Sequence, residues 1–368
     1  MKALLSCLCL IIGISDLKSQ ALRTPDTTNT VCLTGRRLGV TEIEIHYSAP
    51  GVKGREGKIY GTSIVPFGYE VLGYGSTVAS PWRAGADECT TISFSTDVFI
   101  NGQKLPAGKY AFFIEVQKDS SVLIFNENTN AWGSYFYRKE LDVLHVSTVQ
   151  EKNLPNLQER LLYSFANQTG HSVDINLDWE HWRFPIHVQV DLKTTVLESI
   201  REQMSGAIGF DPGSLEAAAR WCVSNDTNYA EALNWINSAV DPALGGRNSF
   251  GPLSIKAAIL KKLGKEKEAD EIVKAAIDNA SIMELHTYGR QLLAEKKLAA
   301  AFDVFQKNFT KNKGAWPTNA GMMRIYSAMG NYKKALEHAK AAVAQAPDEQ
   351  NKKFLEAAVK TLSDGKPL

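Results

Sequence analysis

The C-terminal part of this 368-residue chain repeats at an interval of about 34 residues. Tyr326 aligns with Leu292, Ala335 aligns with Ala301, and Pro347 closes the last unit. A unit this short cannot bury its apolar face alone, so it has to stack against its neighbours. The repeat therefore restricts this part of the chain to an extended array of similar units.

Composition identifies these units as helical. The last 158 residues hold 28 Ala and the first 210 hold 11. Alanine is the best helix former and is depleted in strands. A period of this length, with a small residue where two helices cross, is typical of tetratricopeptide repeats. We therefore predict a tetratricopeptide-like solenoid in preference to a generic helical bundle. The predicted units cover 213–247, 250–281, 282–315 and 316–349, with a cap helix over 351–362.

The first half of the chain alternates apolar and polar residues with a period of two. Segments 42–47, 173–179 and 184–190 alternate in this way, which indicates half-buried strands. Asn101 and Gly102 between two such segments predict a tight hairpin, because both residues tolerate the positive φ of a type I′ turn. Short strands with no helical pattern between them favour an antiparallel β-sandwich.

Together the two patterns predict an α+β multidomain protein, with an N-terminal antiparallel β-sandwich followed by an all-α solenoid. The length is in keeping with about two domains. The predicted parts are a signal peptide at 1–19, an N-terminal extension at 20–37, the sandwich at 38–192, a linker helix at 193–212 and the repeats at 213–365.

The N-terminus has the features of a secretory signal. Lys2 precedes an apolar run of about a dozen residues, and Ser19 provides a small residue before a cleavage site at Gln20. The run is too short to span a bilayer as a helix. Cys7 and Cys9 lie inside it, which disfavours a lipid anchor. We expect a periplasmic or secreted protein with no transmembrane anchor after cleavage.

Removal of that signal leaves three cysteines, and their spacing resembles neither a metal site nor a redox motif. An oxidising compartment permits a disulfide between Cys32 and Cys89. Cys222 lies in a helical pattern, where a buried free thiol is the simpler interpretation.

Six segments of the first half carry motifs in a fixed order. They are residues 46–55 (HYSAPGVKGR), 64–68 (IVPFG), 82–92 (WRAGADECTTI), 101–110 (NGQKLPAGKY), 122–126 (VLIFN) and 132–135 (WGSY). This set resembles the DUF2911 family, a domain of unknown function found in exported proteins of Bacteroidota, and the resemblance covers roughly 38–190. It implies no activity. The loop at 68–81 is longer than the family's, and Asp87 and Cys89 stand where Asn and Ala are usual.

Polar and aromatic residues of these motifs are candidates for a small-ligand or glycan site. The candidates are Lys53, Arg55, Trp82, Arg83, Asp87, Glu88, Asn126, Trp132 and Tyr135. An arginine beside an aromatic residue can bind a carboxylate or stack on a ring, so Arg83 with the two basic residues of the earlier loop would form a basic rim. In the alternative interpretation Arg83 makes an internal salt bridge with Asp87 or Glu88, and Trp132 closes the end of the sandwich.

The sequence contains no recognised catalytic motif. HExxH, GxSxG, the P-loop and the Rossmann fingerprint are all missing. Asp87 and Glu88 are neighbours on a strand and should point to opposite faces, which disfavours an acid–base pair. His171, His181 and His187 are close in sequence, but the resemblance gives them no support as metal ligands. We predict no catalytic residues, no metal and no cofactor, and the net charge of +1 gives no electrostatic case for nucleic acid.

Basic residues recur at the repeat period and are candidates for a peptide-binding groove. Arg290 and Arg324 are one repeat period apart and should occupy the same position of the first helix in successive units, and Lys261 is expected to join them. Stacked guanidinium groups would favour an acidic segment or a C-terminal carboxylate. The alternative is a solvated helix face.

These observations favour an exported binding or scaffold protein whose repeats bind a protein or peptide, with a sandwich of unassigned role. The alternative function is a sandwich that binds a small ligand or glycan, with weak hydrolase activity, around Arg83 and Glu88. The two differ in where a binding site would be found: an open basic groove in the repeats, or a deep pocket at the end of the sandwich.

Overall fold

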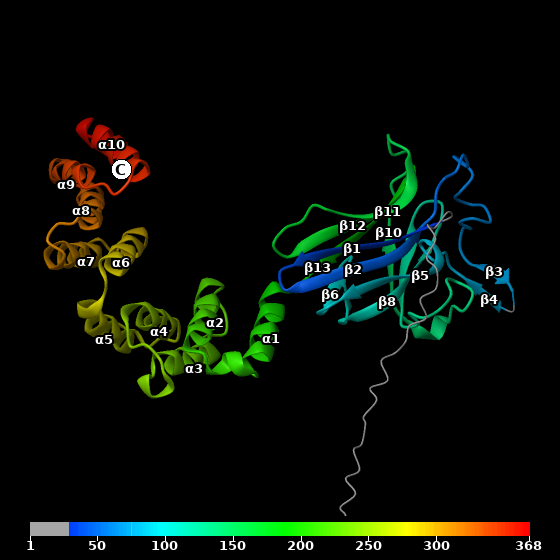
Figure 1. The fold of residues 1–368 in the computed structure, drawn as a ribbon, viewed down its shortest axis with the longest axis horizontal. Coiled ribbons are helices and arrows are strands. Elements are labelled where there is room, and N and C mark those ends of the chain that lie inside the picture. The colour runs from blue at the N-terminus through cyan, green and yellow to red at the C-terminus, as the bar shows by residue number, and fades with distance from the viewer. Residues whose placement is uncertain (1–28, 75) are drawn as a thin grey trace, which may run out of the picture. The chain divides into compact units, whose positions relative to one another are not determined.

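The computed structural model describes residues 29–74 and 76–368, and the signal sequence expected at 1–19 lies outside them. The chain divides into two compact units, Met1–Val196 and Leu197–Leu368. Antiparallel sheets make up the first unit and helices the second (Figure 1). The α+β architecture expected from the two periodicities is confirmed.

Two antiparallel sheets form the sandwich. One has the strand order β1-β2-β5-β8-β9-β10 and the other β11-β12-β13-β6-β7, while β3 and β4 form a separate hairpin. The strands are β1 (Thr30–Leu38), β2 (Thr41–Ala49), β3 (Glu70–Gly73), β4 (Ser76–Ser80), β5 (Ala86–Phe94), β6 (Val98–Ile100), β7 (Gln103–Leu105), β8 (Gly108–Glu115), β9 (Ser121–Asn126), β10 (Asp142–Thr148), β11 (Gln158–Ala166), β12 (Ser172–Glu180) and β13 (Trp182–Gln189).

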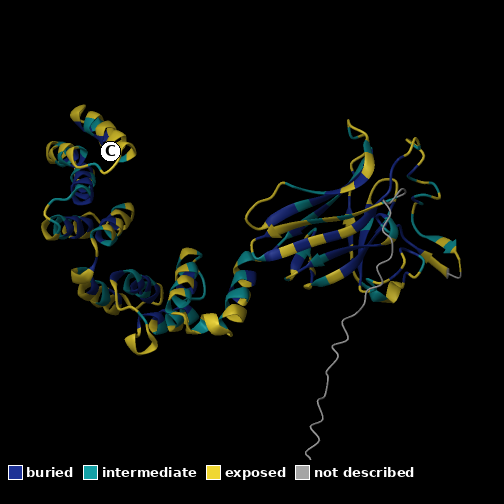
Figure 2. Ribbon diagram, in the orientation of Figure 1, coloured by how far each residue is buried: buried dark blue, intermediate teal, exposed yellow. Residues whose placement is uncertain are grey.

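The core lies between the two sheets and takes alternate residues from each strand. Ile43 and Ile45 of β2 share one buried cluster with Ile175 and Leu177 of β12. Polar residues occupy the intervening positions of β2 and are exposed, so the strand appears banded in Figure 2. This is the period-two alternation read from the sequence, and it fixes the register because a slip of one residue would exchange the two faces.

The strand β1 corrects one predicted boundary. The sequence predicts an extension over 20–37 before the sandwich, but Thr30–Leu38 pairs with β2 along its whole length. β1 is an edge strand and most of its side chains are exposed, so it lacks the apolar alternation that marks a strand in sequence.

One hairpin in the sandwich follows from turn chemistry, and a long loop forms a second. Asn101 and Gly102 join β6 to β7 with φ of 45° and 84°, the two positive values of the predicted type I′ turn. The long loop at 68–81 forms the β3–β4 hairpin, whose residues pair from Glu70 with Ser80 to Gly73 with Ser76.

The second unit consists of helices arranged in consecutive antiparallel pairs. They are α1 (Leu192–Met204), α2 (Pro212–Ser224), α3 (Tyr229–Val240), α4 (Phe250–Lys262), α5 (Glu266–Ala276), α6 (Ile282–Ala294), α7 (Leu298–Lys311), α8 (Trp316–Ala328), α9 (Tyr332–Ala344) and α10 (Glu349–Ser363). In Figure 1, α4, α6 and α8 follow one side of the array and α5, α7 and α9 follow the other. Each pair from α2 to α9 matches one tetratricopeptide-like unit, and α10 covers the last pair.

Local signals in the sequence set where these helices begin. Ser281 and Glu284 form a reciprocal capping box at the start of α6, and Asp348 caps α10 by accepting a hydrogen bond from the Asn351 amide. Within the part of the chain that the structure describes, no helix has the length and apolar character needed to cross a membrane.

Candidate functional site

A pocket of about 370 Å³ opens at one end of the sandwich. Its wall is built from the loop after β2, the segment that leads into β5, and the end of β12. Five of the nine predicted ligand residues line it: Lys53, Arg55, Trp82, Arg83 and Asp87. The structure therefore brings together residues from two motifs that are well separated in sequence.

Arg83 is held in place by the backbone and by an aromatic ring. It donates a hydrogen bond of 2.7 Å to the Asp87 carbonyl oxygen, and its guanidinium lies 5.2 Å from the centre of the Tyr135 ring. The predicted salt bridge with Asp87 or Glu88 is therefore wrong. The Asp87 carboxylate instead accepts a hydrogen bond from Asn29, at 2.9 Å.

Glu88 lies outside the pocket. It is exposed and accepts a hydrogen bond of 3.2 Å from Ser48, on the β2 side of the sheet. Asp87 is the one carboxylate that lines this pocket among the described residues. A glycosidase of the usual kind would need two converging carboxylates, and Asp87 and Glu88 do not converge here.

The loop after β2 is rigid because Arg55 braces it. The Arg55 guanidinium donates to the carbonyl oxygens of Gly51 and Val52, at 2.7 and 2.9 Å, and the Lys53 amide donates to a Glu159 carboxylate oxygen at 3.0 Å. Lys53 has a φ of 52°, an uncommon value for a residue with a side chain.

The segment leading into β5 has the same unusual backbone. Ala84 and Asp87 have φ of 49° and 57°. A positive φ is unfavourable for residues other than glycine, so it is kept only where surrounding contacts stabilise it. Such residues cluster at binding sites.

The floor of the pocket is aromatic. Trp82 and Trp179 lie nearly parallel, with ring centres 6.1 Å apart. Trp179 is only 1% exposed, and its indole Nε1 has no hydrogen-bond partner. The period-two alternation predicts a strand at Trp179 but not its place in the pocket, because its position next to Trp82 depends on the packing of the two sheets.

The remaining three predicted ligand residues do not line the pocket. Asn126 is buried and donates to the Arg138 carbonyl and to Asp142, so it holds the following loop. Trp132 is 53% exposed and does not close the core. The Tyr135 ring packs against the Arg83 guanidinium without lining the pocket.

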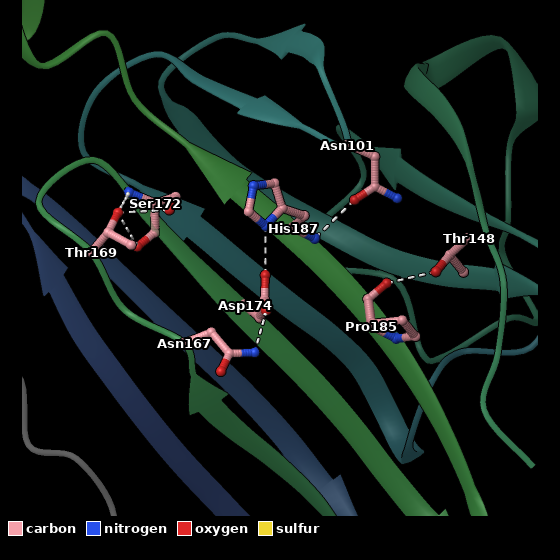
Figure 3. Close-up of polar contacts among 8 residues, drawn as sticks. All are labelled: Asn101, Thr148, Asn167, Thr169, Ser172, Asp174, Pro185 and His187. Carbon is pink, nitrogen blue, oxygen red and sulfur yellow. Dashed lines mark hydrogen bonds and ion pairs between the residues drawn. The ribbon is translucent and has the colours of Figure 1, made fainter.

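Two of the three histidines that are close in sequence, His181 and His187, have separate side-chain partners. His187 lies between Asp174 and Asn101, and the ring Nδ1 is 2.5 Å from an Asp174 oxygen (Figure 3). His181 contacts Glu56 and the Leu154 carbonyl instead. Among the described residues, no group of three His, Cys, Asp or Glu side chains is placed to hold a metal ion.

The disulfide between Cys32 and Cys89 that an oxidising compartment would permit is not formed, and both thiols are free. Cys32 on β1 packs against the core between the sheets, whereas Cys89 on β5 belongs to a cluster on the other face of its sheet. The strand β2 separates the two, which places their backbones about 10 Å apart, beyond the reach of about 7 Å for a disulfide. Cys222 is buried and free, as expected, and burial raises its pKa to about 11.

A second candidate site lies in the repeats. Arg290 is the ninth residue of α6 and Arg324 the ninth of α8, so the two arginines occupy equivalent positions. His286 lies one helical turn before Arg290. We call His286, Arg290 and Arg324 the basic cluster. No acidic side chain in the described parts of the chain forms an ion pair with any of them.

The positively charged groups of the basic cluster disfavour one another's charged forms. Burial and then the neighbouring Arg290 lower the pKa of Arg324. Burial, Arg324 and Arg290 together lower the pKa of His286 to about 4, against a hydrogen bond to the Pro317 backbone that acts in the opposite direction. His286 is 9% exposed, and both its Nδ1 and the Nε of Arg324 are buried without a hydrogen-bond partner.

Lys261 does not belong to the basic cluster, which corrects the predicted groove. Counted from the start of α4, the position equivalent to Arg290 is Ala258, and Lys261 lies one turn later. Lys261 forms an ion pair with Asp270 at 2.7 Å and lines a different cavity, of about 850 Å³, between α4, α5, α6 and α7. Lys261 is out of phase because its sequence spacing from Arg290 is shorter than both the repeat period and the spacing from the start of α4 to the start of α6.

Comparison with known proteins relates the first domain to a family. The family model described as a protein of unknown function (DUF2911) matches residues 29–188. No curated protein matches the chain significantly. Among solved structures, MamA (residues 41 to the end) from Desulfovibrio magneticus RS-1 aligns with 18% identity and a TM-score of 0.28, over 44% of this chain and 92% of that chain. Residues 29–188 thus match the model of a family of unknown function, DUF2911, and are joined here to a solenoid of tetratricopeptide-like repeats.

Proposed function

We propose that this is an exported binding protein whose helical repeats capture a partner protein or peptide through a carboxylate group held by the basic cluster. The observation that carries the proposal is the buried Nε of Arg324, a donor that has no hydrogen-bond partner and lies beside a second arginine. Solenoids of stacked helix pairs commonly present such extended surfaces to partners.

The basic cluster contains interactions that cost free energy in the absence of a partner. A buried polar atom that lacks a hydrogen bond costs about 1–3 kcal/mol, and two guanidinium groups near each other add repulsion. Neither cost is offset among the described residues. A carboxylate placed between Arg290 and Arg324 would offset the repulsion and accept a hydrogen bond from the Arg324 Nε, since it can accept from two guanidinium forks at once.

Phe354 of α10 supports one wall of this site. The Arg324 guanidinium lies 5.1 Å from the centre of its ring, and the ring is half exposed. An apolar side chain next to the bound carboxylate could pack on the exposed part of the ring. The site therefore combines a charged anchor with an apolar contact, as peptide-binding grooves commonly do.

The Arg324→Gln substitution tests this function. We expect it to weaken binding of a short, fluorescein-labelled acidic peptide by about tenfold, because one charge-assisted hydrogen bond is worth roughly 1.5–3 kcal/mol. Fluorescence anisotropy of the full chain measures the affinity. Arg220→Gln is the matched control, because Arg220 is an exposed arginine of α2 that pairs with Glu216.

Three versions of the peptide identify the source of the carboxylate. One has Asp and Glu side chains with an amidated C-terminus, one has Asn and Gln with a free C-terminus, and one lacks both kinds of carboxylate. Binding of only the first or only the second names the source. The proposal fails if the third peptide binds as well as the others, or if Arg324→Gln leaves every affinity unchanged.

Export is part of the same proposal and rests on the sequence of segment 1–20. We expect the mature protein to begin at Gln20, because cleavage follows a small residue after the apolar run. Intact-mass spectrometry of the protein from an envelope or culture fraction measures the new N-terminus. Recovery of the chain with Met1 intact from the cytoplasmic fraction would contradict it.

A further inference from the structure

The pocket at the end of the sandwich has an excess of positive charge. Lys53, Arg55 and Arg83 line it, against one carboxylate, that of Asp87, among the described residues. That carboxylate already accepts a hydrogen bond from Asn29. The lining therefore favours an anionic occupant over a cationic one.

The charged groups of this pocket are fixed before any ligand arrives. Arg83 is held by the Asp87 carbonyl and by the Tyr135 ring, and Arg55 by two carbonyl oxygens of its own loop. A binding site gains affinity when its groups lose little freedom on binding. Braces of this kind thus favour a specific ligand over loose adsorption of ions.

The pocket also has an unpaired donor and a flat apolar surface. The indole N–H of Trp179 can only donate, and it has no acceptor although the side chain is almost completely buried. Trp82 adds an aromatic face that lies nearly parallel to it. An oxygen atom supplied from the pocket would satisfy the Trp179 N–H, and a ring would cover Trp82.

We propose that this pocket binds a small, ring-containing carboxylate. Its carboxylate group contacts Arg83 and Lys53, its ring lies against Trp82, and one of its oxygen atoms accepts the hydrogen bond of Trp179 Nε1. The volume of about 370 Å³ lies within the range of small-molecule pockets. The site is in the DUF2911 domain and is independent of the function proposed for the repeats.

Two matched pairs of probes test the ligand class. The first pair is para-fluorobenzoate and para-fluorobenzamide, and the second is glucuronate and glucose. Each pair keeps the ring and replaces the carboxylate group by a neutral polar group. Binding to the full chain is measured from the indole N–H signals of isotope-labelled protein, with the Trp179 signal assigned from a Trp179→Phe variant.

We expect the acid of at least one pair to shift the Trp179 signal in a saturable way, and its neutral partner to leave the signal in place at the same concentration. A response to benzoate identifies an aromatic acid, and a response to glucuronate identifies a sugar acid. Equal shifts from the acid and its neutral partner, or no shift from any probe, would overturn the proposal.

Variants then locate the charge contact. Lys53→Gln should weaken binding of the responding acid about tenfold, whereas Lys104→Gln, at a lysine of β7 that pairs with Asp97, should not. Arg83→Gln should have a larger effect, but Arg83 also braces the backbone, so a folded Lys53→Gln protein is the deciding case. Unchanged affinity in Lys53→Gln would contradict the assigned contact. Because Arg324→Gln leaves this pocket intact, failure here and failure of the proposed function are separate results.

Discussion

Replacing Phe305 with alanine is expected to lower the free energy of unfolding of the helical repeats by about 4 kcal/mol, the usual cost of emptying a fully buried phenylalanine site. Phe305 lies on α7 and is 0% exposed. Its ring belongs to the core cluster shared by the middle repeats. Urea unfolding followed by far-ultraviolet circular dichroism measures the change, since the helices dominate that signal.

The effect should be large because the ring fills a slot between two helices that only glycine leaves open. Gly289 of α6 and Gly321 of α8 both face Phe305. A Cβ would lie 2.6 Å from the Phe305 ring if built at Gly289, and 2.4 Å from it if built at Gly321. The two backbones therefore contact the ring directly, and they cannot close the space without moving whole helices.

The glycines provide the matched control. Alanine normally stabilises a helix relative to glycine by roughly 0.5–1 kcal/mol. Gly321→Ala should instead destabilise, by about 2 kcal/mol, because its Cβ overlaps Phe305. Gly251→Ala in α4 meets only a flexible Glu284 oxygen at 3.5 Å and should be neutral or stabilising. If Gly321→Ala behaved like Gly251→Ala, the slot would not be as tight as described.

The second large expected effect is a dependence of the free energy of unfolding on pH, and its cause is His286. Its pKa is about 4 in the folded chain, against 6.5 for an ordinary histidine. The unfolded chain therefore takes up the proton first as the pH falls. This residue leaves stability unaffected above about pH 6.5 and costs about 3 kcal/mol by about pH 4, below which the loss is constant.

His286→Gln should remove that part of the pH dependence, because glutamine keeps a polar side chain but does not titrate. Urea unfolding of wild type and variant at a series of pH values gives the difference directly. Carboxylates elsewhere contribute equally to both curves and cancel. Parallel curves between about pH 6.5 and 4 would contradict the assignment of His286 as a buried neutral histidine.

The same titration connects to the proposed function. A carboxylate bound to the basic cluster would offset the charges of Arg290 and Arg324 and favour protonated His286. Binding of an acidic peptide should therefore raise the pKa of His286 and reduce the loss of stability at low pH. NMR titration of the His286 ring with and without peptide measures this linkage.

Much of the fold could be predicted from the sequence because periodicity is a local property. Strand alternation and the helical repeat each identified a domain. The exception was β1, an edge strand whose exposed side chains do not alternate. The site was predicted less completely. Lys53 and Arg83 belong to loop motifs and were found, whereas Trp179 was missed, because only the packing of the two sheets places it in the pocket.

The errors in the predicted sites also arise from features that depend on the folded structure. The pairing of Cys32 with Cys89 failed because the face on which each thiol lies depends on strand order and on a bulge between β2 and β5. Lys261 was misassigned because its spacing from Arg290 is shorter than one unit, so it lies one turn after the equivalent position of α4. Neither strand order nor helix start can be read from the spacing of two residues.

The sequence by itself determined the two architectures, since the choice between strand and helix depends on which neighbouring residues share a face. Only the tertiary structure decided where unmet interactions remain. Trp179 Nε1, His286 Nδ1 and Arg324 Nε are ordinary groups in the sequence. Each lacks a partner because of what surrounds it from elements far away in the chain. Hydrogen bonds and charges are balanced over all spatial neighbours, and these neighbours exist only once the chain has folded.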